Sequence, residues 1–190
     1  MNTLTHFRNL EKDDLRGDCS EGLSFSKHAK GEKITILETG IEYAIADQIR
    51  FHDRNSEFYK IFSFYGVTRS NINKFDQRLR KFGDTAVIII DGNELIHRII
   101  RAAKTRNFGY RIESVSYVNK EKHNGEMGPF RKYSDLNYQS EFRIAFSMNQ
   151  KGPLEDFYIG DIRDISVMYD SDYAIETVKY VIKKNRLRES

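Results

Sequence analysis

A short apolar run followed directly by an amphipathic helical pattern constrains the fold more than any other feature of the sequence. Ala86–Ile90 is the longest apolar run, and its Val and Ile residues predict a strand, Thr85–Asp91, that is buried on both faces. Asn93 is placed to cap the helix that follows. The apolar stripe of this helix consists of Leu95, Ile96, Ile99, Ile100 and Ala103. A strand and a helix in succession, both with apolar surface to bury, indicate helices packed against a sheet.

Alternating side chains predict the other strands of that sheet. Glu141–Ser147 carries Phe142, Ile144 and Phe146 on one face, and Phe58–Tyr65 alternates in the same way. Further strands are predicted at Leu4–Leu10, Lys33–Leu37, Ile41–Ile49, Tyr110–Val118, Phe157–Ile162 and Ile165–Met168. Further helices are predicted from Ser70 or Asn71 to Phe82, within Pro129–Tyr138, and over Ser171–Lys184. We therefore expect a single α+β domain over residues 1–190, with a mixed or antiparallel sheet flanked by about three helices.

The composition excludes several classes of protein. Of the 190 residues, 39% are hydrophobic and 31% charged, which excludes collagen-like and strongly disordered chains. Cys19 is the single cysteine, so an intramolecular disulfide and a multi-cysteine zinc site are excluded. The five histidines lack the spacing of metal ligands, and we predict no metal site. Because no apolar run could span a bilayer and the N-terminus lacks the apolar region of a signal peptide, we expect a cytoplasmic protein without a membrane partner.

The charge balance leaves a nucleic-acid partner open without requiring one. The sequence has 31 Lys and Arg against 28 Asp and Glu, a formal net charge of +3. The clearest basic cluster consists of Lys183, Lys184, Arg186 and Arg188. Such a cluster can contact phosphates, but it also suits the last turn of a helix, where it complements the macrodipole.

The first candidate site is the polar segment Arg16–Gly22. It combines the guanidinium of Arg16 with the carboxylates of Asp18 and Glu21 and with two glycines. These groups could bind a phosphate or a ribose through charge-assisted hydrogen bonds, and we predict that all three residues contact a cofactor. The alternative is a surface turn in which Arg16 pairs with Asp18 or Glu21.

The second candidate site lies at the start of the strand Glu141–Ser147. On an extended strand Gln139, Glu141 and Arg143 point to the same face, because side chains repeat every two residues. Gln139 could orient a nucleophile while Glu141 stabilises positive charge on a ribose, and Arg143 and Tyr138 could contact the cofactor. The alternative is a strand that faces solvent, with an ion pair between Glu141 and Arg143 that contributes little.

Four short motifs resemble an uncharacterised family of prokaryotic and phage proteins akin to the DUF2971-type group. The motifs are Arg16-Gly17-Asp18-x-x-Glu21-Gly22, Phe82-Gly83-Asp84-Thr85-Ala86, Gln139-x-Glu141-Phe142-Arg143-Ile144 and Ile159-Gly160-Asp161. The resemblance extends from about Phe7 to Ile165 and implies a phage or bacterial setting, in defence or counter-defence.

A second resemblance is to ADP-ribosyltransferases of the Arg-Ser-Glu class, which cleave NAD at the nicotinamide bond. The matching residues are Arg16, or alternatively Arg8, then Ser63 and the Gln139-Ser140-Glu141 motif. The Ser-Thr-Ser motif that usually surrounds the central serine is missing. The resemblance implies an ADP-ribosyltransferase-like fold with NAD as the cofactor, in which Arg16 holds the diphosphate, Ser63 positions the ribose and Glu141 stabilises an oxocarbenium-like transition state.

A non-enzymatic function is the alternative hypothesis. Tyr and Arg are enriched in protein interfaces, and the polar segment Asn119–Gly128 could present such residues to a host or phage protein that the chain inhibits or recruits. A nucleic-acid binder is a third hypothesis. Convergence of Arg16, Ser63 and Glu141 on one cleft would favour the first hypothesis over the second.

Overall fold

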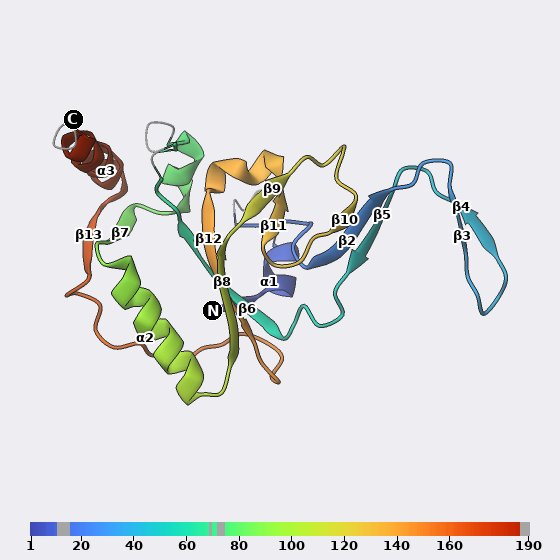
Figure 1. Cartoon of the computed structure of the whole chain (residues 1–190), viewed down its shortest axis with the longest axis horizontal. Helices are drawn as coiled ribbons and strands as arrows, with labels where there is room; N and C mark the ends of the chain where they lie inside the picture. Colours follow the sequence, from blue (N-terminus) through green and yellow to red (C-terminus); the bar gives the residue numbers. More distant parts are fainter. Residues whose placement is uncertain (11–15, 69, 72–74, 187–190) are drawn as a thin grey trace.

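The fold is an α+β structure built around a four-stranded antiparallel sheet (Figure 1). The computed structural model describes residues 1–10, 16–68, 70–71 and 75–186, and side chains up to residue 178. The sheet has the strand order β1 (Asn2–Thr3), β6 (Tyr59–Tyr65), β12 (Glu141–Ser147) and β8 (Gly109–Ser114). β12 pairs along its whole length with β6, whereas β1 pairs with β6 only at Lys60 and Ile61. The sheet therefore has one short edge strand, and the second half of β6 has a neighbour on one side only.

The two faces of this sheet are covered by different elements. On one face, helix α2 (Gly92–Thr105) packs Leu95, Ile99 and Ala103 against Ile144 and Phe146 of β12. The other face packs against the short helix α1 (Leu4–Arg8), where a smaller core is formed by Leu4, Ile61, Phe130 and Ala145. The alternation along β12 thus divides its side chains between two cores.

Three smaller sheets surround this centre. β2 (Leu23–His28) pairs with β5 (Gln48–His52) and β10 (Gly125–Glu126), and β9 (Ser116–Val118) pairs in parallel with β11 (Arg131–Tyr133). β7 (Thr85–Ile89) pairs with β13 (Ser166–Asp170), next to helix α3 (Ser171–Arg186). Two 3₁₀ helices, η1 (Gln77–Phe82) and η2 (Ser134–Gln139), also belong to this part of the fold.

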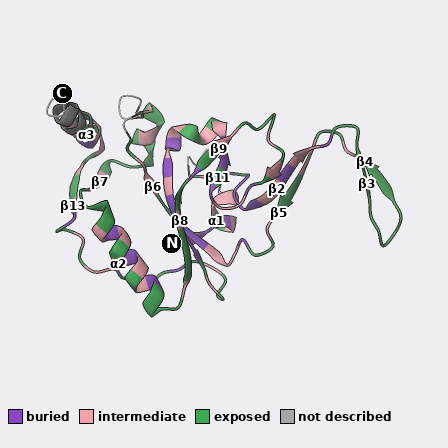
Figure 2. Cartoon of the chain, in the orientation of Figure 1, coloured by how far each residue is buried: buried purple, intermediate pink, exposed green. Residues whose placement is uncertain are grey.

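A two-stranded hairpin projects from the body as an arm. It consists of β3 (Lys33–Thr35) and β4 (Glu42–Ala44), and it is exposed along its whole length (Figures 1 and 2). Leu37 at its tip is 91% exposed. An isolated two-stranded hairpin is only marginally stable in water. Because both strands of this arm are exposed along their whole length, they receive little stabilisation from packing against the body.

The strongest sequence patterns are confirmed. β12 has the predicted bounds, Glu141–Ser147, and α2 lies where the apolar stripe predicted a helix. The cap of α2 is Asp91 rather than Asn93, since the Asp91 side chain accepts a hydrogen bond from the Glu94 amide at 2.9 Å. The α+β fold class is also confirmed.

Several predicted strands are wrong. In place of the strand predicted at Leu4–Leu10, Leu4–Arg8 forms α1, because Thr3 caps a helical turn that buries Leu4. Ile41–Ile49 divides between β4 and β5, and Phe157–Ile162 forms no strand. Tyr110–Val118 is interrupted at Val115, whose buried side chain separates β8 from β9. β7 is correctly placed but is not buried on both faces, since its sheet has only two strands and Val87 is exposed.

Two predicted helices also differ. Of the helix predicted from Ser70 or Asn71 to Phe82, the structure has only η1, and residues 72–74 lie outside those described. Within Pro129–Tyr138 the chain forms β11 and η2. α3 confirms the last helix, although the side chains of its basic cluster lie outside the described residues. Among the described residues, no helix combines the length and the apolar character needed to cross a bilayer.

Candidate functional site

A cleft of about 860 Å³ opens along the second half of β6, where the strand has a neighbour on one side only. Because neighbouring side chains of a strand point to opposite faces, the cleft has a polar side and an apolar side. Ser63 and Glu141 line the polar side, whereas Phe62, Phe64 and Phe142 line the apolar side together with residues of α2, β7 and α3. The cleft therefore curves around a strand edge and offers both charged groups and aromatic rings to a ligand.

A buried cluster of five charged groups forms the polar side. Its members are Asp18, Glu21, Lys132, Glu141 and Arg143, all of them buried. Arg143, only 1% exposed, donates from Nη1 and Nη2 to the carboxylate of Glu21 at 2.8 and 3.1 Å. Its Nη2 and Nε also donate to Oε2 of Glu141 at 2.8 and 3.1 Å. By formal charge, the three carboxylates exceed the two cations by one, although burial raises the pKa of Asp18.

Glu141 is held by donors on both of its oxygens. Lys132 Nζ donates to Oε1 at 2.5 Å, and Ser63 Oγ donates to Oε2 at 2.6 Å, in addition to the two bonds from Arg143. Lys132 Nζ also donates to Oε1 of Gln139 at 2.9 Å. The carboxylate thus has a fixed orientation at the wall of the cleft, next to the exposed hydroxyl of Ser63.

The electrostatics keep Glu141 ionised. Burial acts to raise the pKa of Glu141, but the charges of Arg143 and Lys132 and the hydrogen bonds to it outweigh burial and lower this pKa to about 2. Asp18 differs: burial, followed by repulsion from Glu21, raises its pKa. Since Glu141 already accepts four hydrogen bonds and has a low pKa, it is suited to stabilise positive charge and poorly suited to accept a proton.

Local structure explains how distant segments meet in this cluster. Glu141 and Arg143 are two residues apart on β12, so they share a face, and Ser63 lies opposite Arg143 in the register of β6. The loop that carries Glu21 is held by a turn, in which the Glu21 amide donates to the Asp18 carbonyl oxygen at 2.8 Å. The Asp18 carboxylate accepts from the Ser20 amide at 2.8 Å.

The structure brings most of the predicted site residues together. Ser63, Gln139, Glu141, Arg143, Glu21 and Arg16 all line the cleft. Among the described residues, Asp18 and Tyr138 do not line it: the Asp18 carboxylate lies 4.0 Å from Lys132 Nζ within the buried cluster, and the guanidinium of Arg78 lies over the ring of Tyr138 at 3.6 Å from its centre. Of the two candidate arginines, Arg16 lines the cleft, whereas Arg8 contacts Nδ1 of His52 at 3.0 Å.

The environment of these residues differs from the expected one. Gln139 ends η2 and does not extend the strand, but Lys132 still links its side chain to Glu141. The ion pair between Glu141 and Arg143 exists, yet it is buried rather than facing solvent. Glu21 pairs with Arg143, a residue far away in the sequence.

Lys132 is the main residue that the sequence patterns missed. It lies on β11, and its ammonium group contacts Gln139 and Glu141 and lies 3.6 Å from Glu21. No motif or periodicity marked this residue, because its position depends on the parallel pairing of β11 with β9. Among the described residues, no group of three or more His, Cys, Asp or Glu side chains is arranged to hold a metal ion.

Comparisons with known proteins give no relative: no family model, no curated protein and no solved structure matches this chain.

Proposed function

We propose that the cleft binds NAD and that the protein cleaves the bond between nicotinamide and ribose, transferring ADP-ribose to an acceptor. The observation that carries this proposal is the hydrogen bond of 2.6 Å from Ser63 Oγ to Glu141 Oε2 at the wall of a cleft that Arg16 also lines. These three residues come from separate parts of the sequence and converge on one cleft.

The charge distribution supports this chemistry. When the bond between C1′ of the ribose and N1 of nicotinamide breaks, nicotinamide leaves with the electron pair and positive charge develops on the ribose. The ionised carboxylate of Glu141, in a cluster with a formal excess of negative charge, would stabilise that charge. An acceptor or water then attacks C1′ and releases its proton to solvent. In this scheme Arg16 binds the diphosphate and the aromatic side of the cleft stacks on a ring of the dinucleotide.

Incubation of the purified protein with labelled NAD, alone and with cell lysate, tests the proposal. We expect nicotinamide release or labelled acceptor, reduced about 100- to 1,000-fold in Glu141→Gln, the magnitude typical for the loss of one electrostatic stabiliser. Ser63→Ala removes an exposed hydroxyl and should lower the rate with little effect on folding. Glu113→Gln is the matched control, since Glu113 is an exposed partner of Arg111. Absence of both products with the wild-type protein would refute the proposal.

The arm supports a second candidate function, the binding of a protein partner. Exposed apolar residues, Ile34, Ile36, Leu37, Ile41 and Tyr43, follow the hairpin. Exposed apolar surface on a monomer often marks an interaction site. In a pull-down experiment, a partner recovered with Glu141→Gln but lost with Leu37→Asp would favour this function over the enzymatic one.

A further inference from the structure

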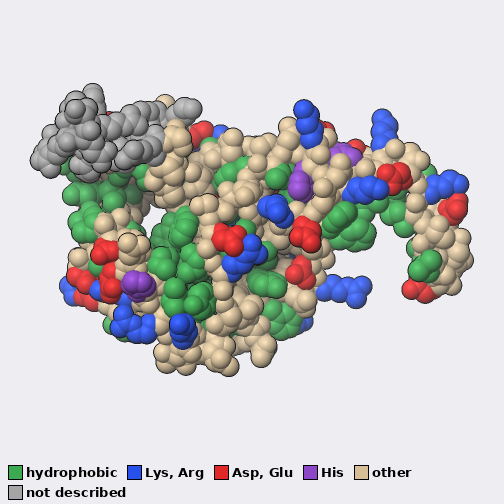
Figure 3. Space-filling view, in the orientation of Figure 1, with side chains coloured by type: hydrophobic (Ala, Val, Ile, Leu, Met, Phe, Trp, Pro, Cys, Tyr) green, Lys and Arg blue, Asp and Glu red, His purple; other side chains and the backbone are tan. Residues whose placement is uncertain are grey.

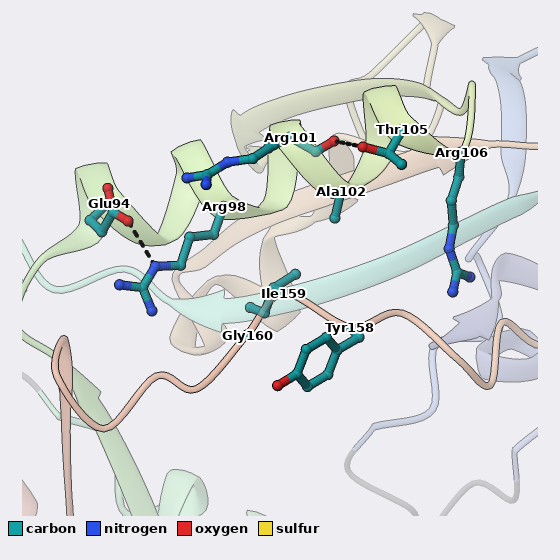
Figure 4. Close-up of a pocket in the computed structure, with 9 residues that line it drawn as sticks. All are labelled: Glu94, Arg98, Arg101, Ala102, Thr105, Arg106, Tyr158, Ile159 and Gly160. Carbon is teal, nitrogen blue, oxygen red and sulfur yellow. Dashed lines mark hydrogen bonds and ion pairs between the residues drawn. The ribbon is translucent and has the colours of Figure 1, made fainter.

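A second cavity, on the opposite side of α2 from its apolar stripe, has a basic lining. It has a volume of about 510 Å³ and lies between the exposed side of α2 and the segment 158–160 (Figure 4). Arg98, Arg101 and Arg106 line it from α2 and from the residue that follows the helix, and Tyr158 lines it from the other wall. Figure 4 shows Arg98 and Arg106 extending from the helix toward the Tyr158 segment, while Arg101 lies along the helix.

The basic groups of this cavity differ in whether they are already paired. Arg98 donates to Glu94 Oε1 at 2.7 Å and to the Asp164 carboxylate, so its charge is largely compensated. By contrast, Arg101, Lys104 and Arg106 have no ion pair within the part of the chain that the structure describes. Two of these uncompensated cations, Arg101 and Arg106, line the cavity, whereas Lys104 lies on α2 outside its lining.

This concentration accounts for the charge of the whole chain. Residues 92–106 hold four cations, Arg98, Arg101, Lys104 and Arg106, against the single carboxylate of Glu94, an excess of three. The formal net charge of the protein is also +3, so the remainder of the chain is neutral in sum. In Figure 3 several basic side chains lie around α2 at the lower left, next to acidic ones, and others are spread over the centre and right of the molecule. A local excess of this kind is the electrostatic footprint of a polyanion partner.

Tyr158 supplies the second element of recognition. It is 81% exposed, and within the described residues its ring contacts no other aromatic ring. A large exposed ring beside uncompensated cations is the combination found in proteins that bind single-stranded nucleic acids, where the ring stacks on an unpaired base and the cations contact phosphates. A duplex would offer phosphates to the arginines but no open base face to the tyrosine.

We propose that Arg101, Arg106 and Tyr158 form a binding site for single-stranded nucleic acid, in which the two arginines contact the phosphates and Tyr158 stacks on a base. The site lies outside the cleft of Glu141 and does not depend on the function proposed for that cleft.

Fluorescence anisotropy with fluorescein-labelled (dT)₁₀ and (rU)₁₀ tests the site. At physiological salt, about 150 mM, we expect a Kd in the range of about 1–100 μM for at least one strand, typical of sequence-independent binding. Two phosphate contacts predict a slope of log K against log salt of about −1.4, since each contact on a single strand contributes about −0.7. Arg101→Gln combined with Arg106→Gln should remove most of this salt dependence. Tyr158→Ala should weaken binding by about 5- to 150-fold.

Matched controls distinguish binding at this site from nonspecific attraction to the positive charge of the protein. Arg54→Gln removes an exposed arginine from a distant turn, and Tyr43→Ala removes an exposed tyrosine from the arm; neither should change affinity by more than about twofold. Circular dichroism of each variant verifies folding, which we expect to be unchanged because the substituted side chains are exposed. The proposal is overturned if neither strand binds, if Arg54→Gln weakens binding as much as Arg101→Gln, if Tyr158→Ala has no effect, or if thymidine monophosphate binds as tightly as (dT)₁₀.

Discussion

Replacement of Arg143 by methionine tests whether the buried charge cluster holds the two halves of the site together. The guanidinium bonds to the carboxylates of Glu21 and Glu141 and donates to the carbonyl oxygen of Pro129. Methionine has a similar length and no charge, so Arg143→Met removes these bonds with little change in packing volume.

The expected cost is large because two carboxylates lose their cation in a buried environment. Glu21 and Glu141 would be left with Lys132 as the main nearby cation. Removal of one partner from a buried ion pair typically costs about 3–5 kcal/mol, whereas removal of an exposed partner costs at most about 1 kcal/mol. We therefore expect a loss of about 4 kcal/mol at pH 7, or about 8–16 °C in Tm for a chain of this size.

Urea denaturation followed by far-ultraviolet circular dichroism measures this loss. Arg111→Met is the matched control, because Arg111 pairs with Glu113 in solvent. The deficit of Arg143→Met should shrink toward pH 4.5, since unpaired buried carboxylates have raised pKa values and take up protons there. A loss of less than about 1 kcal/mol, equal to that of Arg111→Met, would refute the view that the ion pairs of Arg143 are shielded from solvent and stabilise the folded protein.

Three further predictions concern acid stability, a buried lysine and the core. The pKa of Glu141 is lowered from 4.5 to about 2, so its contribution of about 3 kcal/mol is present above pH 4.5 and is lost as the pH falls toward 2; Glu141→Gln should lack this part of the acid titration of stability. Lys60 is buried and donates to the carbonyl oxygens of Glu57 and Gln150, so Lys60→Met should cost about 1–3 kcal/mol in urea denaturation by leaving both without their donor. Ile144→Ala should cost about 2–5 kcal/mol by the same measurement, because Ile144 is buried under α2.

The elements that the sequence predicted well are those whose pattern is local and strong. β12 and α2 each bury one regular face against the other, so period-two and helical spacing both match the structure. The strand predicted at Leu4–Leu10 is wrong, because the cap at Thr3 and the burial of Leu4 favour a helix. The prediction that β7 is buried on both faces is wrong, because an apolar run indicates apolar surroundings on average and does not reveal how many strands flank it.

The sequence allowed most residues of the candidate site to be predicted, but not the ion pairs and hydrogen bonds that join them. Period two placed Glu141 and Arg143 on one face, and the resemblance to ADP-ribosyltransferases added Ser63. The bond between Arg143 and Glu21 joins residues 122 positions apart, and no local pattern encodes such a partner. The position of Lys132 depends in the same way on strand pairing outside its own segment.

The separation of Glu21 from Arg143 also has a consequence for the order in which the protein is made. During translation the chain emerges at about 5–20 residues per second, so Glu21 precedes Arg143 by about 6–24 s. For that interval Glu21 lacks the cation that it pairs with in the folded protein, while the pairing of β2 with β5, local in the sequence, can already form. The charge cluster of the cleft can therefore be completed only after most of the chain has been synthesised.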